Sequence, residues 1–234
     1  MSGFSDTGRV RTQNEDIFAF DAAQGLAVLA DGMGGSNSGG VAAQIAVDSV
    51  LSFLRAASAP IDTELLCAAV AHANNRVFDE SRNSAAHIGM GTTLVVTRIG
   101  DTVGWVAHVG DSRAYRLRGS TLSQLTKDHS VVQELIDAGA ITAEEARQAP
   151  NRNIITRAIG LEPSLEVDAS EFDVADGDVV LLCSDGLSDL LGDRDIAELL
   201  IEHKDDLDGA ARQLVKSANA AGGTDNVTVV LVAL

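Results

Sequence analysis

The sequence predicts an α+β domain in which pairs of helices cover mostly antiparallel sheets. In the middle of the chain, several apolar strand-like segments follow one another with no helix between them, which favours antiparallel neighbours. The helix-like segments come in sequence pairs, unlike the strict alternation of a doubly wound fold. The chain has 234 residues, enough for one sizeable core. We therefore expect a single domain over residues 1–234.

Apolar and β-branched runs predict the strands. They are DIFAFDA, LAVLAD, GTTLVVTRIG, TVGWVAHVGD, RAYRLRGSTLSQLT, DVVLLCSD and NVTVVLVAL, which begin at residues 16, 26, 91, 102, 113, 178 and 226. Within the fifth run, Arg118 and Gly119 mark the turn of a hairpin.

Apolar residues at helical spacing predict the main helices. These segments are residues 40–57, 62–82, 193–204 and 206–221. Thr142 followed by Glu145 forms a capping box for a further short helix, which must end near Pro150. That helix belongs to an insertion between strands, at about residues 128–160, which we interpret as a mobile flap.

Charge and composition exclude several classes of protein. A net charge of −17 argues against a nucleic-acid partner, whose phosphates are neutralised by Lys and Arg. We expect no signal peptide, because residues 1–16 lack a basic stretch followed by an apolar one. No apolar run approaches the roughly 20 residues of a membrane span. Cys67 and Cys183 lie in apolar contexts typical of a reducing compartment. We expect a cytoplasmic protein and, by default, a monomer.

Acidic residues gather where the predicted strands end. Asp31, Asp111 and Asp185 each close an apolar run, and Asp225 comes directly before the last one. A single Asp beside Gly is typical of a turn, but antiparallel strands bring their starts and ends to one edge, so these carboxylates can converge. An all-oxygen ligand set favours a hard cation such as Mg²⁺ or Mn²⁺.

The segment RTQNED adds Arg11, Glu15 and Asp16 just before the strand at residue 16. An arginine beside acids has two interpretations that this stretch alone leaves open. It is either the salt-bridge partner of a carboxylate or a planar fork that binds a phosphate.

The glycine-rich stretch GLAVLADGMGGSNSGGVAAQ, which begins at Gly25, raises a nucleotide-binding alternative. It lacks the G-K-[ST] of a P-loop and the spacing G-x-G-x-x-G, which argues against a nucleotide-binding or kinase-like protein. We interpret Gly34, Gly35, Gly39 and Gly40 as a tight exit from Asp31 and Gly32 into the first long helix.

The motifs RTQNED, LADGMGG, GMGTTL, VGDSRAY, LTKDHS, SDGLSD and GGTDNVTVV occur in this order over nearly the whole chain. Because it carries these seven motifs in this order, the chain resembles the bacterial form of the PP2C (PPM) family of metal-dependent protein serine/threonine phosphatases. The resemblance implies a four-layer α/β/β/α sandwich of two antiparallel sheets flanked by helix pairs. It also implies two Mn²⁺ or Mg²⁺ ions and a third, weaker metal.

The resemblance also implies a role for each motif residue. Asp31 bridges two metal ions, Asp185 and Asp225 hold the first, and the Gly32 carbonyl holds the second. Glu15 and Asp16 act mainly through metal-bound waters.

The remaining motif residues concern the substrate and the weaker metal. Arg11 holds the substrate phosphate. Asp111 and Asp185, with Asp189, form the third site, although Asp189 has the alternative of a local helix cap. The insertion at 128–160 corresponds to the flap beside the active site, where Ala149 replaces the His of many bacterial members.

The implied reaction is hydrolysis of phosphoserine or phosphothreonine by a water that bridges the two metals. Met33 stands where eukaryotic members carry a His, as in bacterial relatives. His108 and His129 are candidates to replace that His as general acid, although we expect His108 to pack inside a strand. A metal-bound water is the preferred acid.

Two further functional alternatives remain. One is a noncatalytic sensor or scaffold of the same fold, which the intact acids argue against. The other is a phosphatase of small phosphoesters. The expected partners are phosphorylated proteins, among them a Ser/Thr kinase and its targets.

Overall fold

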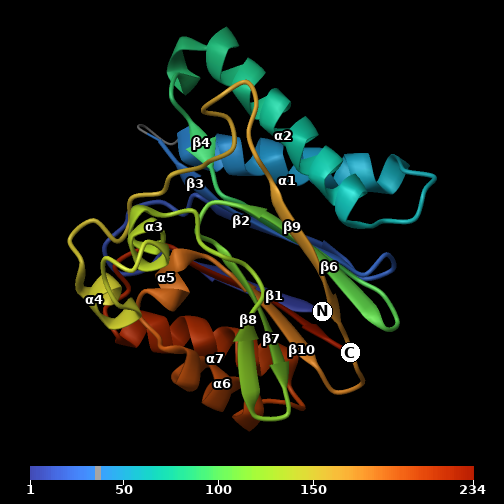
Figure 1. The fold of residues 1–234 in the computed structure, drawn as a ribbon, viewed down its shortest axis with the longest axis vertical. Coiled ribbons are helices and arrows are strands. Elements are labelled where there is room, and N and C mark those ends of the chain that lie inside the picture. Colours follow the sequence, from blue (N-terminus) through green and yellow to red (C-terminus); the bar gives the residue numbers. More distant parts are fainter. Residues whose placement is uncertain (35–37) are drawn as a thin grey trace.

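Two antiparallel sheets face each other in the computed structural model, which describes residues 1–34 and 38–234 (Figure 1). The first sheet has the order β1 (Ser2–Asp6), β11 (Val227–Ala233), β10 (Val179–Cys183), β7 (Arg113–Arg118) and β8 (Thr121–Gln124). The second has the order β2 (Asp16–Asp21), β3 (Leu26–Met33), β5 (Leu94–Ile99), β6 (Val103–Val109) and β9 (Asp168–Asp173), with β4 (Gly91–Thr92) paired to β3.

Helices cover the outer face of each sheet (Figure 1). On the second sheet lie α1 (Ser38–Ala56) and α2 (Thr63–Asn83), followed by the 3₁₀ turn η1 (Ala85–His87). On the first sheet lie α5 (Asp185–Ser188), α6 (Asp193–Glu202) and α7 (Leu207–Ala220). The four-layer α/β/β/α sandwich is thereby confirmed.

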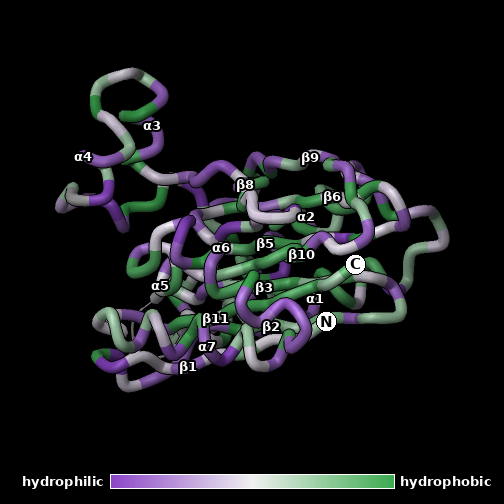
Figure 2. The backbone as a smooth tube through the Cα atoms, turned by 90° about the horizontal axis from the view of Figure 1, so that it is seen from below, coloured by the Kyte–Doolittle hydropathy of each residue, from purple (hydrophilic) through white to green (hydrophobic). Residues whose placement is uncertain are grey.

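Apolar side chains fill all three spaces between the layers. Leu29, Val95, Leu182 and Val230 lie between the two sheets and are fully buried. The other two clusters join each sheet to its helices. Figure 2 shows the central strands as largely hydrophobic. Because three layers of apolar contact hold the strands, their ends are fixed relative to one another.

The strands and helices predicted from periodicity are present, with bounds that shift by a few residues. β1 and β9 are not among the strands predicted from the sequence. Both are edge strands rich in polar residues, SGFSD and DASEFD, so they lack the apolar run that marks a buried strand. The single run predicted from Gly91 is divided into β4 and β5. The predicted loop residue Gly35 lies outside the described residues.

The insertion carries α3 (Val131–Asp137), which was not predicted, and α4 (Ala143–Gln148), which begins with the predicted capping box. Both helices stand away from the layered body in Figures 1 and 2. The two chain termini lie near each other at the opposite end of the sandwich, where Ser2 pairs with Leu231. Among the described helices, none has the length and apolar character needed to cross a membrane.

Candidate active site

The candidate site lies at the edge where strands of both sheets end. Asp16 and Asp31 are register partners across β2 and β3. Asp185 follows β10 as the first residue of α5, and Asp225 lies just before β11. Asp111 follows the end of β6. The strand ends therefore bring carboxylates from both sheets together, as the sequence pattern predicts.

A cavity of about 220 Å³ opens at this edge. The acids that line it are Glu15, Asp31, Asp111, Asp185 and Asp225, together with Gly32 and Arg11. Of the predicted site residues, only Asp16 and Asp189 do not line it. The structure thus gathers most of the predicted set around one open space.

Asp16 lies directly behind this cavity and is 4% exposed. The Ser184 hydroxyl donates a hydrogen bond to its Oδ2 at 2.8 Å, while Oδ1 has no partner among the described residues. Burial, together with repulsion from Asp225, raises the pKa of Asp16 to about 6, against three side-chain hydrogen bonds that lower it. A buried carboxylate oxygen without a donor is costly unless a proton or a cation reaches it.

Two glycines allow the backbone segments of the site to touch. A Cβ on Gly39, in the first turn of α1, would lie 2.6 Å from the carbonyl carbon of Gly32. A Cβ on Gly186 would lie 1.9 Å from the carbonyl oxygen of Asn226. Because only glycine permits such contacts, the sequence Asp185-Gly186 brings α5 against the segment that carries Asp225.

Asn226 and Thr93 support the site and were not singled out in the sequence analysis. Asn226 Nδ2 donates to the carbonyl oxygens of Thr7 and Gln13, and its Oδ1 accepts from the Glu15 backbone N–H at 2.9 Å. The Asp31 backbone N–H donates to Thr93 Oγ1 at 3.0 Å. Asn226 lies within the motif GGTDNVTVV and Thr93 within GMGTTL, but only the folded structure shows which backbone groups they bind.

Repulsion among the acids controls the electrostatics of the cavity. Burial and the neighbouring carboxylates raise the pKa values of Asp31 and Asp185 well above the ordinary range. Burial, followed by the charge of Asp128, raises the pKa of Asp111 to about 7. Oδ1 of Asp185 is buried and has no hydrogen-bond partner among the described residues. Divalent cations would relieve this repulsion without protonation.

The residues present fit a site for hard divalent cations. The acids that line the cavity offer carboxylate oxygens, and Gly32, which also lines it, has a backbone carbonyl to add. Mg²⁺ and Mn²⁺ prefer such oxygen ligands. Among the described residues, no three His, Cys, Asp or Glu side chains are drawn together closely enough to hold an ion by themselves. Backbone carbonyls and waters would therefore complete the coordination, as is usual for Mg²⁺.

Arg11 reaches the cavity from the segment between β1 and β2. Its Nη2 donates to Asp225 Oδ2 at 2.7 Å, and its side chain is 56% exposed. The bond to Asp225 raises the pKa of Arg11, so the group carries a fixed positive charge. Both interpretations left open by the sequence are therefore compatible: one edge of the guanidinium pairs with Asp225, and the other remains accessible to a ligand.

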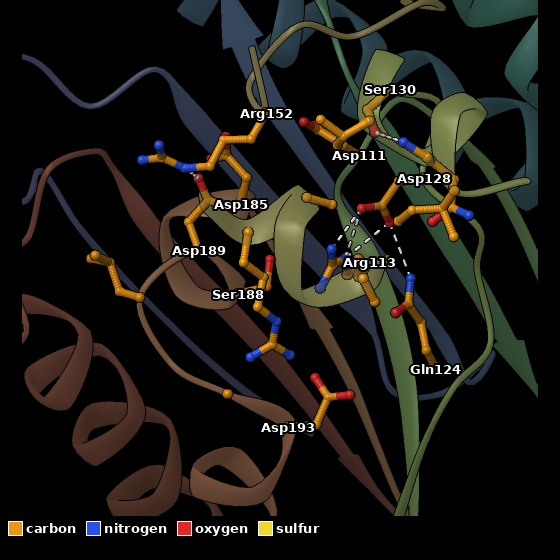
Figure 3. Close-up of a pocket in the computed structure, with 18 of the residues that line it drawn as sticks. Asp111, Arg113, Gln124, Asp128, Ser130, Arg152, Asp185, Ser188, Asp189 and Asp193 are labelled. Carbon is orange, nitrogen blue, oxygen red and sulfur yellow. Dashed lines mark hydrogen bonds and ion pairs between the residues drawn. The ribbon is translucent and has the colours of Figure 1, made fainter. Parts of the chain in front are cut away.

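A second cavity, of about 320 Å³, adjoins the first and shares Asp111 and Asp185 with it. It lies between the insertion and α5. Figure 3 shows Arg113 and Gln124 turned toward Asp128, and Arg152 toward Asp189.

Asp189 belongs to this second cavity. It is the C-cap residue of α5, where its backbone N–H donates to the Asp185 carbonyl, and its carboxylate pairs with Arg152 at 3.5 Å. The N-cap of the next helix, α6, is Gly192.

The alternative proton donors lie outside the first cavity. His108 is buried in β6, as expected, and its Nε2 bonds to the Lys127 carbonyl at 2.8 Å. His129 is also buried and stacks on His108. Met33 lines the cavity but has no proton to donate.

The two cysteines are free in the described structure. Burial raises the pKa of Cys183 to about 12, which argues against a thiolate nucleophile.

The sandwich and the acid-lined cavity at its edge define a metal-dependent hydrolase of phosphate esters. A sequence profile described as protein phosphatase 2C matches residues 8–229, and this chain belongs to that family.

Curated relatives match over nearly the whole chain. The serine/threonine phosphatase stp of Listeria monocytogenes is 37% identical over 235 residues, covering 97% of this chain and 93% of that protein. Protein phosphatase PhpP of Streptococcus pneumoniae is 36% identical over 245 residues, covering 100% and 97%.

Solved structures agree with this assignment. The serine/threonine phosphatase PstP/Ppp of Mycobacterium tuberculosis superimposes with a TM-score of 0.91 at 37% identity, covering 98% of this chain and 96% of that one. The catalytic domain of a PstP in complex with two manganese ions gives a TM-score of 0.88 at 36% identity, covering 98% and 95%. The chain is a metal-dependent serine/threonine protein phosphatase.

Proposed function

We propose that the cavity lined by Asp31 is the catalytic centre of this phosphatase, and that its acids hold two divalent ions. Asp31, Asp185 and Asp225 would be the side-chain ligands and the Gly32 carbonyl a backbone ligand, with Glu15 and Asp16 acting through water. The observation that carries this proposal is the set of repelling carboxylates, including unpartnered buried oxygens of Asp16 and Asp185. Such a set is stabilised by bound cations.

The ions, when bound, supply Lewis-acid charge that activates water and offsets the charge of the phosphoryl group. Arg11 would bind the phosphate through the edge that faces away from Asp225 and hold it over the acids. Asp225 keeps the guanidinium in this orientation. Cys183 is buried and His129 does not line the cavity, so neither side chain is placed to attack the phosphorus. Direct attack by water needs no such protein nucleophile.

We propose that Asp111, Asp185 and Asp189 bind a third, weaker ion. Asp111 and Asp185 line both cavities, and Asp189 lines only the larger one. The ion pair of Asp189 with Arg152 would have to open for the carboxylate to reach that ion. The occupancy of this site would therefore depend on the insertion that carries Arg152.

We propose that the chain is one phosphatase domain with a flap at about residues 128–160. The flap residues Asn153 and Ile155 line the smaller cavity, so they would contact the polypeptide that bears the phosphate. Its substrates would be phosphoproteins, among them a Ser/Thr kinase and the targets of that kinase. Both cysteines are free, which suits a reducing compartment such as the cytoplasm. A monomer is our default, which sedimentation would test.

The decisive experiment measures phosphate release from a phosphothreonine protein, with Mn²⁺ and with a chelator. We expect Asp31→Asn to lose more than about 100-fold in kcat/KM, because even outer-shell residues of metal sites cost roughly 10–100-fold. Asp101→Asn, in the exposed turn before β6, is the matched control and should keep full activity. Full activity of Asp31→Asn, or activity that resists the chelator, would contradict the proposal.

Binding is measured separately from catalysis. Mn²⁺ should raise the Tm of the wild-type protein and of Asp101→Asn, since an ion that binds only the folded state stabilises it. The same addition should have less effect on Asp31→Asn. An autophosphorylated kinase and p-nitrophenyl phosphate, compared as substrates, then separate a protein phosphatase from one that acts on small phosphoesters.

A further inference from the structure

The base of the insertion at 128–160 is a small hydrogen-bonded junction. The two ends of the insertion run antiparallel where Ser130 and Ile155 form an isolated β-bridge. The Thr156 N–H donates to the His129 carbonyl at 2.8 Å, and the Val131 N–H donates to the Ile154 carbonyl at 2.9 Å. The outgoing and returning chains are therefore joined at His129.

His129 also binds Gly110 in two places. Its backbone N–H donates to the Gly110 carbonyl at 3.0 Å, and its ring Nδ1 lies 3.1 Å from the Gly110 N–H, which can only donate. Nδ1 must therefore carry a lone pair, and the proton of the neutral ring is on Nε2. Gly110 has a φ of +103° and directly precedes Asp111, so this pair of bonds fixes the backbone on which Asp111 is mounted.

The surroundings of the ring keep it in this form. Nε2 lies 3.5 Å from Asp168 Oδ2 and 3.4 Å from Arg157 Nη1, and Arg157 Nη1 donates to Asp168 Oδ1 at 2.9 Å. Arg157 can only donate, so its longer contact competes with the bond from the Gly110 N–H at 3.1 Å, and the shorter bond sets the tautomer. The opposite face stacks on His108, with ring centroids 4.7 Å apart. Burial, His108 and Arg157 disfavour a charged ring more than Asp168 favours one, so the pKa of His129 lies below its ordinary value of 6.5.

Both sides of the junction lead to the cavities. Asp111 lines both of them, and Asn153 and Ile155, a few residues before Thr156, line the smaller one. A rotation of the ring would remove the bond from the Gly110 N–H to Nδ1, so that only the backbone bond from the His129 N–H to the Gly110 carbonyl would still join the base of the insertion to Gly110. We propose that His129 is a positioning residue, whose neutral ring fixes Asp111 through Gly110 and fixes the base of the insertion relative to the acids. This inference rests on the proposed function, since it assumes that Asp111 belongs to the active site.

Two amide variants separate the roles of the two ring nitrogens. The oxygen of Asn reaches about as far from the backbone as Nδ1 and can accept from the Gly110 N–H. The amide of Gln reaches the position of Nε2 instead, and leaves that N–H without its acceptor. We expect His129→Asn to keep kcat/KM within about 3-fold of wild type, and His129→Gln to lose at least 10-fold. His203→Asn, at the end of α6, controls for a His-to-amide change elsewhere.

The pH profile gives a readout that a merely structural role would not move. Protonation of Nδ1 would break the bond to Gly110, whereas the Asn amide does not titrate. The ratio of kcat/KM for His129→Asn to that for wild type should therefore rise from pH 7.5 to pH 5.5. The same ratio for His203→Asn should stay constant. A constant ratio for His129→Asn overturns the proposal even if the Gln variant does not fold.

Limited trypsin digestion tests the junction without any assay of activity. Arg147 and Arg152 are cleavage sites within the insertion. In metal-free protein, cleavage there should be faster in His129→Gln than in wild type and unchanged in His129→Asn.

Equal cleavage and equal activity of the Asn and Gln variants would overturn the inference. A wild-type protein without metal-dependent activity would instead refute the proposed function, and the digestion would still test the junction.

Discussion

The contact between Gly32 and Gly39 leads to a prediction with a matched control in the same helix. Gly39→Ala places a Cβ 2.6 Å from the Gly32 carbonyl carbon and 2.7 Å from the Met33 nitrogen. Both are backbone atoms that cannot rotate away. Gly40→Ala, one residue further along α1, places its Cβ 3.6 Å from the nearest atom, Glu15 Cα, which is ordinary van der Waals contact.

The two substitutions share one favourable effect and differ in one unfavourable effect. Alanine is favoured over glycine in a helix interior by about 1 kcal/mol at most, and this gain is similar at both positions. Overpacking costs about 1–3 kcal/mol, and close contact with three backbone atoms of Gly32 and Met33 puts Gly39→Ala at the upper end. We expect Gly39→Ala to be less stable than Gly40→Ala by about 2–3 kcal/mol, or about 4–12 °C in Tm at about 2–4 °C per kcal/mol.

Thermal unfolding of the metal-free proteins measures this difference directly. Since Gly32 lines the cavity and its carbonyl is a proposed metal ligand, Gly39→Ala should also raise the Mn²⁺ concentration needed for half-maximal activity, whereas Gly40→Ala should not. Equal Tm values for the two variants would refute the reasoning, because they would mean that α1 moves away from Gly32 at no cost.

Two further predictions concern charge. In the metal-free protein the raised pKa values of Asp16 (to about 6) and Asp111 (to about 7) mean that the folded state holds protons that the unfolded chain releases near 3.8. Stability should therefore fall as pH rises through this window. With chelator we expect a higher Tm at pH 6 than at pH 8 and a smaller difference with Mn²⁺, and a rise from pH 6 to pH 8 with chelator would contradict this. Arg11→Ala should lower kcat/KM by roughly 10–100-fold, the value of a charge-assisted hydrogen bond of about 1.5–3 kcal/mol, whereas Arg194→Ala, on the outer face of α6 with its side chain 89% exposed, should not. An increase in KM alone would assign Arg11 to ground-state binding, a fall in kcat as well would add the transition state, and an unchanged kcat/KM would remove it from the site.

The sequence predicts the buried part of this fold well because periodicity reports burial. β3, which carries Asp31, and β11, which starts after Asp225, are largely apolar, and each lies inside its sheet with a strand on either side. Edge strands such as β9 are mostly polar, with few apolar residues, and so lack the apolar run that predicts a strand. The local sequence pattern therefore predicts the buried strands of each sheet better than its edge strands.

The candidate site divides in the same way. The acids could be listed from strand ends, but their supports could not. Asn226 acts through contacts with residues more than 200 positions away along the chain. The partition of the acids between two cavities, with Asp189 on the side of Arg152, depends on where the insertion folds. Such long-range pairings have no counterpart in local periodicity.

The position of the two termini has a practical consequence for building reagents from this protein. β11 runs from beside Asp225 to Ala233, and at about 3.3 Å per residue its seven residues carry the chain roughly 20 Å from the acids. β1 pairs with it in the antiparallel sense, so Met1 lies at that same remote end. A fluorescent reporter, a surface linker or a tethered kinase attached at either terminus would leave the mouth of the cavity clear. An immobilised or fused enzyme should therefore turn over a protein substrate as the free enzyme does.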